Sequence, residues 1–224
     1  MGEESRLWLF GDSFVQYPEN WVLALTAKSK SKLYYLGVGG ASIYWVLIDI
    51  LNNYDKIKKE DKILICIPST QRWFFNKVHF NPQDSNLGWS QDTKPLRDRD
   101  TIDAFKKYIL HLHSTEESTL YAASIASHII NVIIPNLPTK KVTYLFSIEG
   151  EQYLGGWHKR FIDAREYEPP SLLTTGLNFI NKVYGKNTHL EDIFLNTNNH
   201  WIDHPQYYKV WWDTYDPVLE ILYE

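Results

Sequence analysis

The chain has 224 residues, of which 44% are hydrophobic and 15% aromatic, so it can bury the core of one sizeable domain. Its formal net charge of −4 argues against a general nucleic-acid binder, because such proteins present a basic surface. The single cysteine, Cys66, excludes an internal disulfide, and no Cys–His spacing indicates a metal site, so we expect no metal and no other cofactor.

The first residues lack the charged-then-apolar pattern of a secretion signal, and no apolar run reaches membrane-spanning length. We therefore expect a soluble cytoplasmic protein with no membrane partner. Cys66 lies inside the apolar run 63–67, which predicts an inert core thiol.

Strands and helices are predicted to alternate over the first 70 residues. The apolar residues 7–10 form a first strand that ends in the tight turn Gly11-Asp12-Ser13. A second strand over 33–36 runs into the glycine-rich turn 37–42, and Ser42 is suited to cap the next helix. The stripe of the first helix is Trp21, Val22 and Leu25, and that of the second is Ile43, Val46, Leu47, Ile50, Leu51 and Tyr54.

A charged connector over 56–62 leads to a third strand over 63–67, whose continuous apolar run is typical of a parallel strand buried on both faces. This alternation predicts an α/β fold. Residues 73–100 show no periodicity and predict an irregular insert.

The second half of the chain contains fewer clear elements. Helices are expected over 101–113 and from a capping box at 114–117 to about residue 134, followed by a strand over 141–148. A short helix over 177–183 and a helix over 207–215 come next, and Asp216-Pro217 is expected to begin a separate final turn. Val210, Trp211 and Tyr215 are predicted to face inward. With no domain boundary in the pattern, residues 1–224 are expected to form a single domain.

Three loops that follow the early strands meet at one edge of a parallel sheet, where open α/β folds bind ligands. They carry Ser13, Gly39-Gly40 and residues 68–72. A hydroxyl nucleophile also needs a base to accept its proton and donors to hold an oxyanion. The candidates for that base are His200 and His204, just before the last helix.

This combination resembles the SGNH (GDSL-type) hydrolase family, through four blocks in the family's order. Gly11-Asp12-Ser13 is similar to the block that supplies the nucleophile, and residues 37–42 resemble the glycine block, with Gly40 in the oxyanion position. The resemblance implies a three-layer α/β/α sandwich around a central, mostly parallel sheet. The short Gly-Asp-Ser-Phe opening is also similar to divergent SGNH-like proteins carried by bacteriophages.

The chain departs from the family pattern in its third and fourth blocks. Thr70 falls where the family has its oxyanion asparagine, with Gln71 and Arg72 beside it. Arg72 either binds an anionic group of the substrate or pairs with a surface acid. The family's aspartate lies three residues before its histidine, but Thr197 precedes His200 by that interval.

His200 is favoured as the base because the sequence Asn-His-Trp-Ile ahead of a helix resembles the family's Asn-His-Leu-Ser form. Its orienting group is then Asp203, Asp192 or a backbone carbonyl. His204 is interpreted as a helix-entry residue beside Pro205.

The resemblance implies a serine esterase that removes an acetyl or other short acyl group from a small-molecule or carbohydrate ester. Ser13 is the expected nucleophile and His200 the base, with the Ser13 and Gly40 amides and the Thr70 or Gln71 side chain as oxyanion donors. One alternative is a catalytically impaired binding or assembly protein of the same fold, which the two departures favour. A third reading, phosphodiester hydrolysis, depends on Arg72 alone.

Overall fold

The structure is a computed structural model that describes residues 4–16, 20–69, 73–75, 78–80, 89–90, 115–147, 169–185 and 204–223, with residues 103, 107 and 202 between them. Its main sheet has four parallel strands in the order β2-β1-β3-β7. These strands are β1 (Arg6–Phe10), β2 (Lys32–Tyr35), β3 (Lys62–Ile67) and β7 (Lys141–Phe146). The predicted α/β class is confirmed, and β1 lies inside the sheet between β2 and β3.

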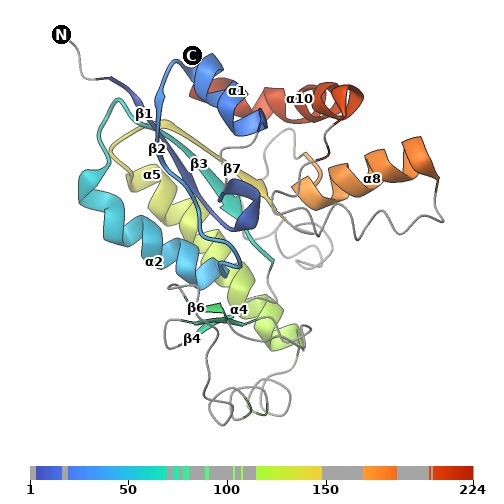
Figure 1. The fold of residues 1–224 in the computed structure, drawn as a ribbon. Coiled ribbons are helices and arrows are strands. Elements are labelled where there is room, and N and C mark those ends of the chain that lie inside the picture. The colour runs from blue at the N-terminus through green and yellow to red at the C-terminus, as the bar shows by residue number, and fades with distance from the viewer. Residues whose placement is uncertain are drawn as a thin grey trace.

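Helices pack against both faces of this sheet, as Figure 1 shows. The helices are α1 (Asn20–Ser29), α2 (Ile43–Asn53), α4 (Thr115–His128), α5 (Ile134–Asn136), α8 (Leu172–Tyr184) and α10 (Pro205–Leu219). The 3₁₀-helices are η1 (Ser13–Val15), η2 (Tyr54–Lys56) and η4 (Glu220–Leu222), and the π-helix is η3 (Ile129–Ile133).

Two buried clusters follow from the alternation of side chains along β1. Leu7 and Leu9 pack in one cluster with residues of α1, α8 and α10, whereas Trp8 and Phe10 pack in the other with residues of α2 and α4. Both faces of β1 are therefore covered, so the first predicted strand is buried. The complete three-layer SGNH sandwich stays a prediction.

Several local predictions are confirmed in the first 70 residues. The three α1 residues Trp21, Val22 and Leu25 are buried, and every residue of β3 is buried. The Ser42 side chain caps α2 by accepting a hydrogen bond of 3.3 Å from the amide of Trp45.

Two predicted inward positions are wrong. Leu51 is 50% exposed and Val210 is 38% exposed. Leu51 follows the buried Ile50 in α2, and Val210 precedes the buried Trp211 in α10. Because adjacent helical residues point about 100° apart, only one of each pair can face the sheet.

Both prolines expected to end a helix lie inside helical structure. Pro135 belongs to α5, which continues from η3, where the Ile134 amide donates to the Ile129 carbonyl in the wider π-helical pattern. The wider turn accommodates a residue that has no amide hydrogen. Asp216-Pro217 does not restart the last helix either, because α10 runs through Pro217 to Leu219.

Two other segments are more regular than predicted. Part of the 73–100 insert forms a small antiparallel sheet of β4 (Trp73–Phe75), β5 (Val78–Phe80) and β6 (Trp89–Ser90), and β4 lies next to α2. Helix α8 starts five residues earlier than the predicted 177, because the Ser171 side chain caps it at the Thr174 amide. The helix expected over 101–113 falls almost wholly outside the described residues.

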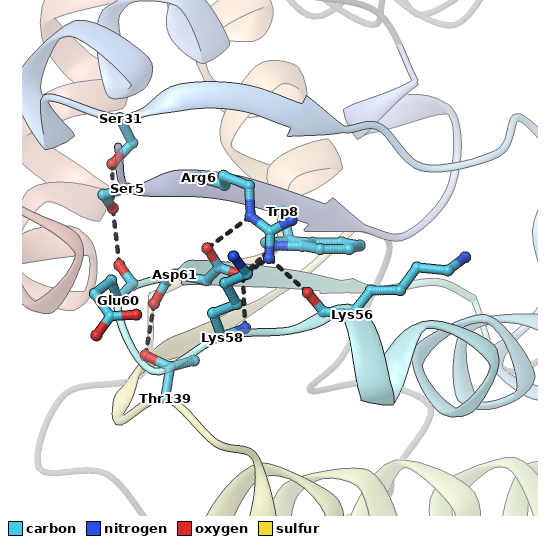
Figure 2. Close-up of polar contacts among 9 residues, drawn as sticks. All are labelled: Ser5, Arg6, Trp8, Ser31, Lys56, Lys58, Glu60, Asp61 and Thr139. Atoms are coloured by element: carbon cyan, nitrogen blue, oxygen red, sulfur yellow. Dashed lines mark hydrogen bonds and ion pairs between the residues drawn. The ribbon is translucent and has the colours of Figure 1, made fainter. Parts of the chain in front are cut away.

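Asp61, in the segment predicted as a charged connector, is buried beside the start of β1 (Figure 2). Its carboxylate accepts hydrogen bonds from Arg6 at 2.9 and 2.6 Å, from Trp8 Nε1 at 2.9 Å and from the Lys58 amide at 2.8 Å. The Thr139 hydroxyl, just before β7, donates to the Asp61 carbonyl. One residue therefore links the starts of β1, β3 and β7.

We expect Asp61→Asn to lower the free energy of unfolding by about 3 kcal/mol, because it leaves the Arg6 guanidinium without its buried counter-ion. The matched control is Asp55→Asn, which removes an exposed carboxylate nearby in the chain and should change stability by about 0.5 kcal/mol or less. Urea denaturation of the three proteins measures the difference. Equal stabilities of the two variants would contradict the structural role of Asp61.

The same carboxylate gives stability a pH dependence. Burial opposes ionisation of Asp61, but the hydrogen bonds from Arg6, Lys58 and Trp8 outweigh it, so its pKa lies below the ordinary value. A lowered folded-state pKa adds stability above the unfolded-state value near about 4, and this contribution is lost as the pH falls through the folded-state pKa. The difference in unfolding free energy between wild type and Asp61→Asn should therefore be full at pH 6 and shrink steadily below about pH 4.

Candidate active site

Ser13 lies at the carboxyl end of the interior strand β1, as the first residue of η1. The buried Asp12 side chain caps η1 by accepting from the Phe14 amide at 3.2 Å, and the Val15 amide donates to the Asp12 carbonyl at 3.1 Å. Ser13 itself is only half-buried, whereas Phe14 and Val15 pack in the core. The turn therefore presents Ser13 at the edge of the sheet on a rigidly held backbone.

Gly11 permits this turn to lie directly against β3. A Cβ atom at Gly11 would meet Cys66 Cβ at 2.7 Å and the Cys66 carbonyl at 2.8 Å, and its φ of +154° disfavours any other residue. Gly37, which follows β2, lies equally close to Gly11, because a Cβ atom added at Gly37 would meet the Gly11 carbonyl oxygen at 2.5 Å. The two glycines bring three segments into main-chain contact.

Hydrogen bonds hold the glycine loop to the same turn. The Gly37 amide donates to the Val15 carbonyl and the Val38 amide donates to the Gly11 carbonyl, both at 3.0 Å. The loop then closes a turn in which the Ala41 amide donates to the Val38 carbonyl at 3.0 Å. Gly40 has a φ of +74°, as the third position of a type II turn requires. The structure thus brings Ser13 and the Gly40 loop together at one edge.

Gln16 is a residue that the sequence interpretation missed at this edge. Its carboxamide lies against Gly39, since a Cβ at Gly39 would have the Gln16 carboxamide as its nearest neighbour, with Cδ at 2.9 Å and Nε2 at 3.2 Å. The signal that could have found it is its spacing of three residues from Ser13, which places both on one side of a 3₁₀ turn.

Most of the other predicted site residues lie outside the described residues. These are Thr70, Gln71, Arg72, Asp192, His200 and Asp203. The structure therefore gives the positions of the Ser13 turn and the Gly40 loop, and the catalytic roles of all these residues stay predictions.

His204 is described, and it acts as a structural residue. It is the N-cap of α10, where its Nδ1 accepts a hydrogen bond of 3.2 Å from the Gln206 amide. Its ring also packs against Phe179 at a centroid distance of 5.3 Å. The interpretation of His204 as a helix-entry residue is confirmed.

Cys66 in β3 lies next to Gly11 and is completely buried in the core. Burial, together with the negative charge of Asp12, raises the pKa of its thiol well above the ordinary value. The prediction of a core cysteine is confirmed, and we expect its buried, protonated thiol to be unreactive.

Among the described residues, no group of three or more His, Cys, Asp or Glu side chains is arranged to hold a metal ion. In the same part of the chain, none of the helices combines the length and apolarity needed to cross a membrane. Comparison of the chain with protein-family models, with curated proteins and with solved structures gives no match.

We expect Gly11→Ala to lower the free energy of unfolding by about 3 kcal/mol, because the new methyl group overlaps Cys66 and the positive φ is strained. Gly185→Ala is the matched control, since its φ is also positive, at +87°, but nothing lies within 4 Å of the added atom. This control carries the backbone strain alone, at φ +87° and ψ +157°, and should lose about 2 kcal/mol. Urea midpoints of both variants separate crowding from backbone strain, and equal losses would rule out a close contact at Gly11.

Proposed function

We propose that this protein is a serine esterase, in which Ser13 Oγ attacks the carbonyl carbon of an acetyl or other short-chain ester. The observation that carries the proposal is the position of Ser13 at the carboxyl end of an interior parallel strand, next to a hydrogen-bonded glycine loop. Ligands of open α/β folds bind at this edge. The half-buried side chain is consistent with access for a substrate.

In the proposed reaction His200 accepts the Ser13 proton as the carbon–oxygen bond forms, and Asp203 orients the imidazole. The Ser13 and Gly40 amides donate to the oxyanion of the tetrahedral intermediate, with Thr70 or Gln71 adding a side-chain donor. His200 then returns the proton to the leaving alcohol. Water, deprotonated by the same imidazole, releases the acyl group from Ser13 as a carboxylic acid.

The described residues support Gly40 as an oxyanion donor, because none of the hydrogen bonds among them uses its amide. Each donor of this kind contributes on the order of 3 kcal/mol.

A fluorophosphonate probe tests the nucleophile. We expect the wild-type protein to gain one covalent label at Ser13 and to hydrolyse p-nitrophenyl acetate, because an activated serine attacks both reagents. Ser13→Ala should abolish the label, and His200→Gln should slow labelling by about 100-fold or more. The matched control is Ser124→Ala on α4, whose hydroxyl is exposed and bonded to the Leu120 carbonyl. Intact-mass measurement and peptide mapping give the result.

Absence of both the Ser13 label and esterase activity from folded wild-type protein would refute the esterase proposal. That outcome favours a binding or assembly protein, which the replacement of the family's asparagine by Thr70 and of its aspartate by Thr197 supports from sequence. Phosphodiester hydrolysis that depends on a divalent cation would instead support the reading based on Arg72.

A further inference from the structure

Ser13 and Gln16 occupy the same side of one helical turn. Ser13 is the first residue of η1, and Gln16 is its C-cap, still in helical conformation with φ −76° and ψ −32°. Side chains three residues apart eclipse one another in a 3₁₀-helix. Both are half-buried, whereas Phe14 and Val15 between them are 4% and 0% exposed. The side of the turn that faces away from the core therefore carries a hydroxyl and a carboxamide.

The Gln16 carboxamide extends from this turn to the glycine loop. The three heavy atoms nearest to a Cβ built on Gly39 all belong to it, namely Oε1, Cδ and Nε2. Gly39 immediately precedes Gly40, whose loop is bonded to the Ser13 turn through Gly37 and Val38. The carboxamide thus lies on the loop that supplies the proposed oxyanion amide.

The described residues leave the hydrogen-bonding capacity of the Gln16 carboxamide unused. None of the hydrogen bonds found among the described residues involves the Gln16 side chain. A carboxamide nitrogen carries two N–H donors, and glutamine and asparagine side chains are among the groups that stabilise oxyanions in acyl transfer. An amide donor on the same side of the turn as the proposed nucleophile is therefore chemically suited to a carbonyl oxygen.

We propose that Gln16 contacts the substrate, with its Nε2–H group donating a hydrogen bond to the ester carbonyl oxygen as that oxygen gains negative charge. This inference rests on the proposed function of Ser13. The bond strengthens as the carbonyl becomes tetrahedral and returns to a neutral contact when the leaving group departs. Gln16 then adds a side-chain donor to the backbone donors of Ser13 and Gly40.

The first test is Gln16→Met, which keeps an unbranched side chain against Gly39 and removes both donors. We expect kcat for p-nitrophenyl acetate and the rate of fluorophosphonate labelling at Ser13 to fall about 100-fold. KM and the melting temperature should change little, because the packing is retained. Gln206→Met, the same exchange at an exposed position of α10, is the matched control and should leave both rates unchanged.

A second variant, Gln16→Glu, gives a signature that packing alone cannot produce. Its carboxyl group donates when protonated, but it repels an oxyanion when ionised. The ratio of the Gln16→Glu rate to the wild-type rate should therefore fall as the pH rises through about 4 to 6. A role confined to supporting Gly39 predicts a constant ratio.

The contact with Gly39 allows a double-mutant cycle. Gly39→Ala should slow labelling of Ser13 in the wild-type background, because the new methyl group displaces the carboxamide. It should have little effect in the Gln16→Ala background, where that space is empty. Additive effects of the two substitutions would contradict the proposed contact.

The outcomes separate the two proposals. If wild-type Ser13 is labelled and Gln16→Met reacts at the wild-type rate, the role of Gln16 is overturned and the esterase proposal stands. If wild-type Ser13 is neither labelled nor active, both are overturned. If Gln16→Met loses its fold, the pH-dependent ratio of Gln16→Glu and the Gly39→Ala cycle decide.

Discussion

The main-chain contact between Gly11 and Gly37 is the constraint on which the edge of the sheet depends. Any side chain at Gly11 would push the Ser13 turn away from Cys66, and any at Gly37 would separate the glycine loop from that turn. The loop hydrogen bonds at Val15 and Gly11 require the same approach. Because protein interiors are close-packed, this contact allows the backbones of the two segments to pack in only one way.

Strand β1 is held at its other end as well. There the Asp61 carboxylate bonds Arg6 and Trp8, one on each side of Leu7, while its carbonyl accepts from Thr139. The Arg6 guanidinium also lies over the rings of Trp8 and Tyr34, at 5.2 and 4.4 Å from their centroids. A strand fixed at both ends and packed on both faces is a rigid support for the proposed nucleophile Ser13, because rigid elements position functional groups better than mobile ones.

The α/β class and the position of Ser13 could be predicted because they depend on local patterns: apolar runs, the Gly-Asp-Ser turn and the Ser42 cap. Asp49 and Asp61 could not be identified as buried, since their partners Tyr35 and Arg6 come from other elements. Helix α10 likewise continues through Pro217 because tertiary packing of Trp211, Tyr215 and Leu219 outweighs the local signal of a proline. The contact of Gln16 with Gly39 joins two loops far apart in the chain, so local patterns contain little trace of it.

The chain order of the two core clusters has a consequence for synthesis on the ribosome. Strands β1, β2 and β3 and helix α2 are complete by residue 67, so one face of the sheet acquires a helix early. The other face carries Leu7, Leu9 and Leu64, and apart from α1 its cover comes from α8 and α10, at residues 172–184 and 205–219. The contact between Trp21 and Trp211, with ring centroids 4.9 Å apart, forms only after α10 has been translated. In a nascent chain, this face is therefore covered by α1 alone until residues 172–219 have been translated, and exposed apolar surface of this kind favours aggregation.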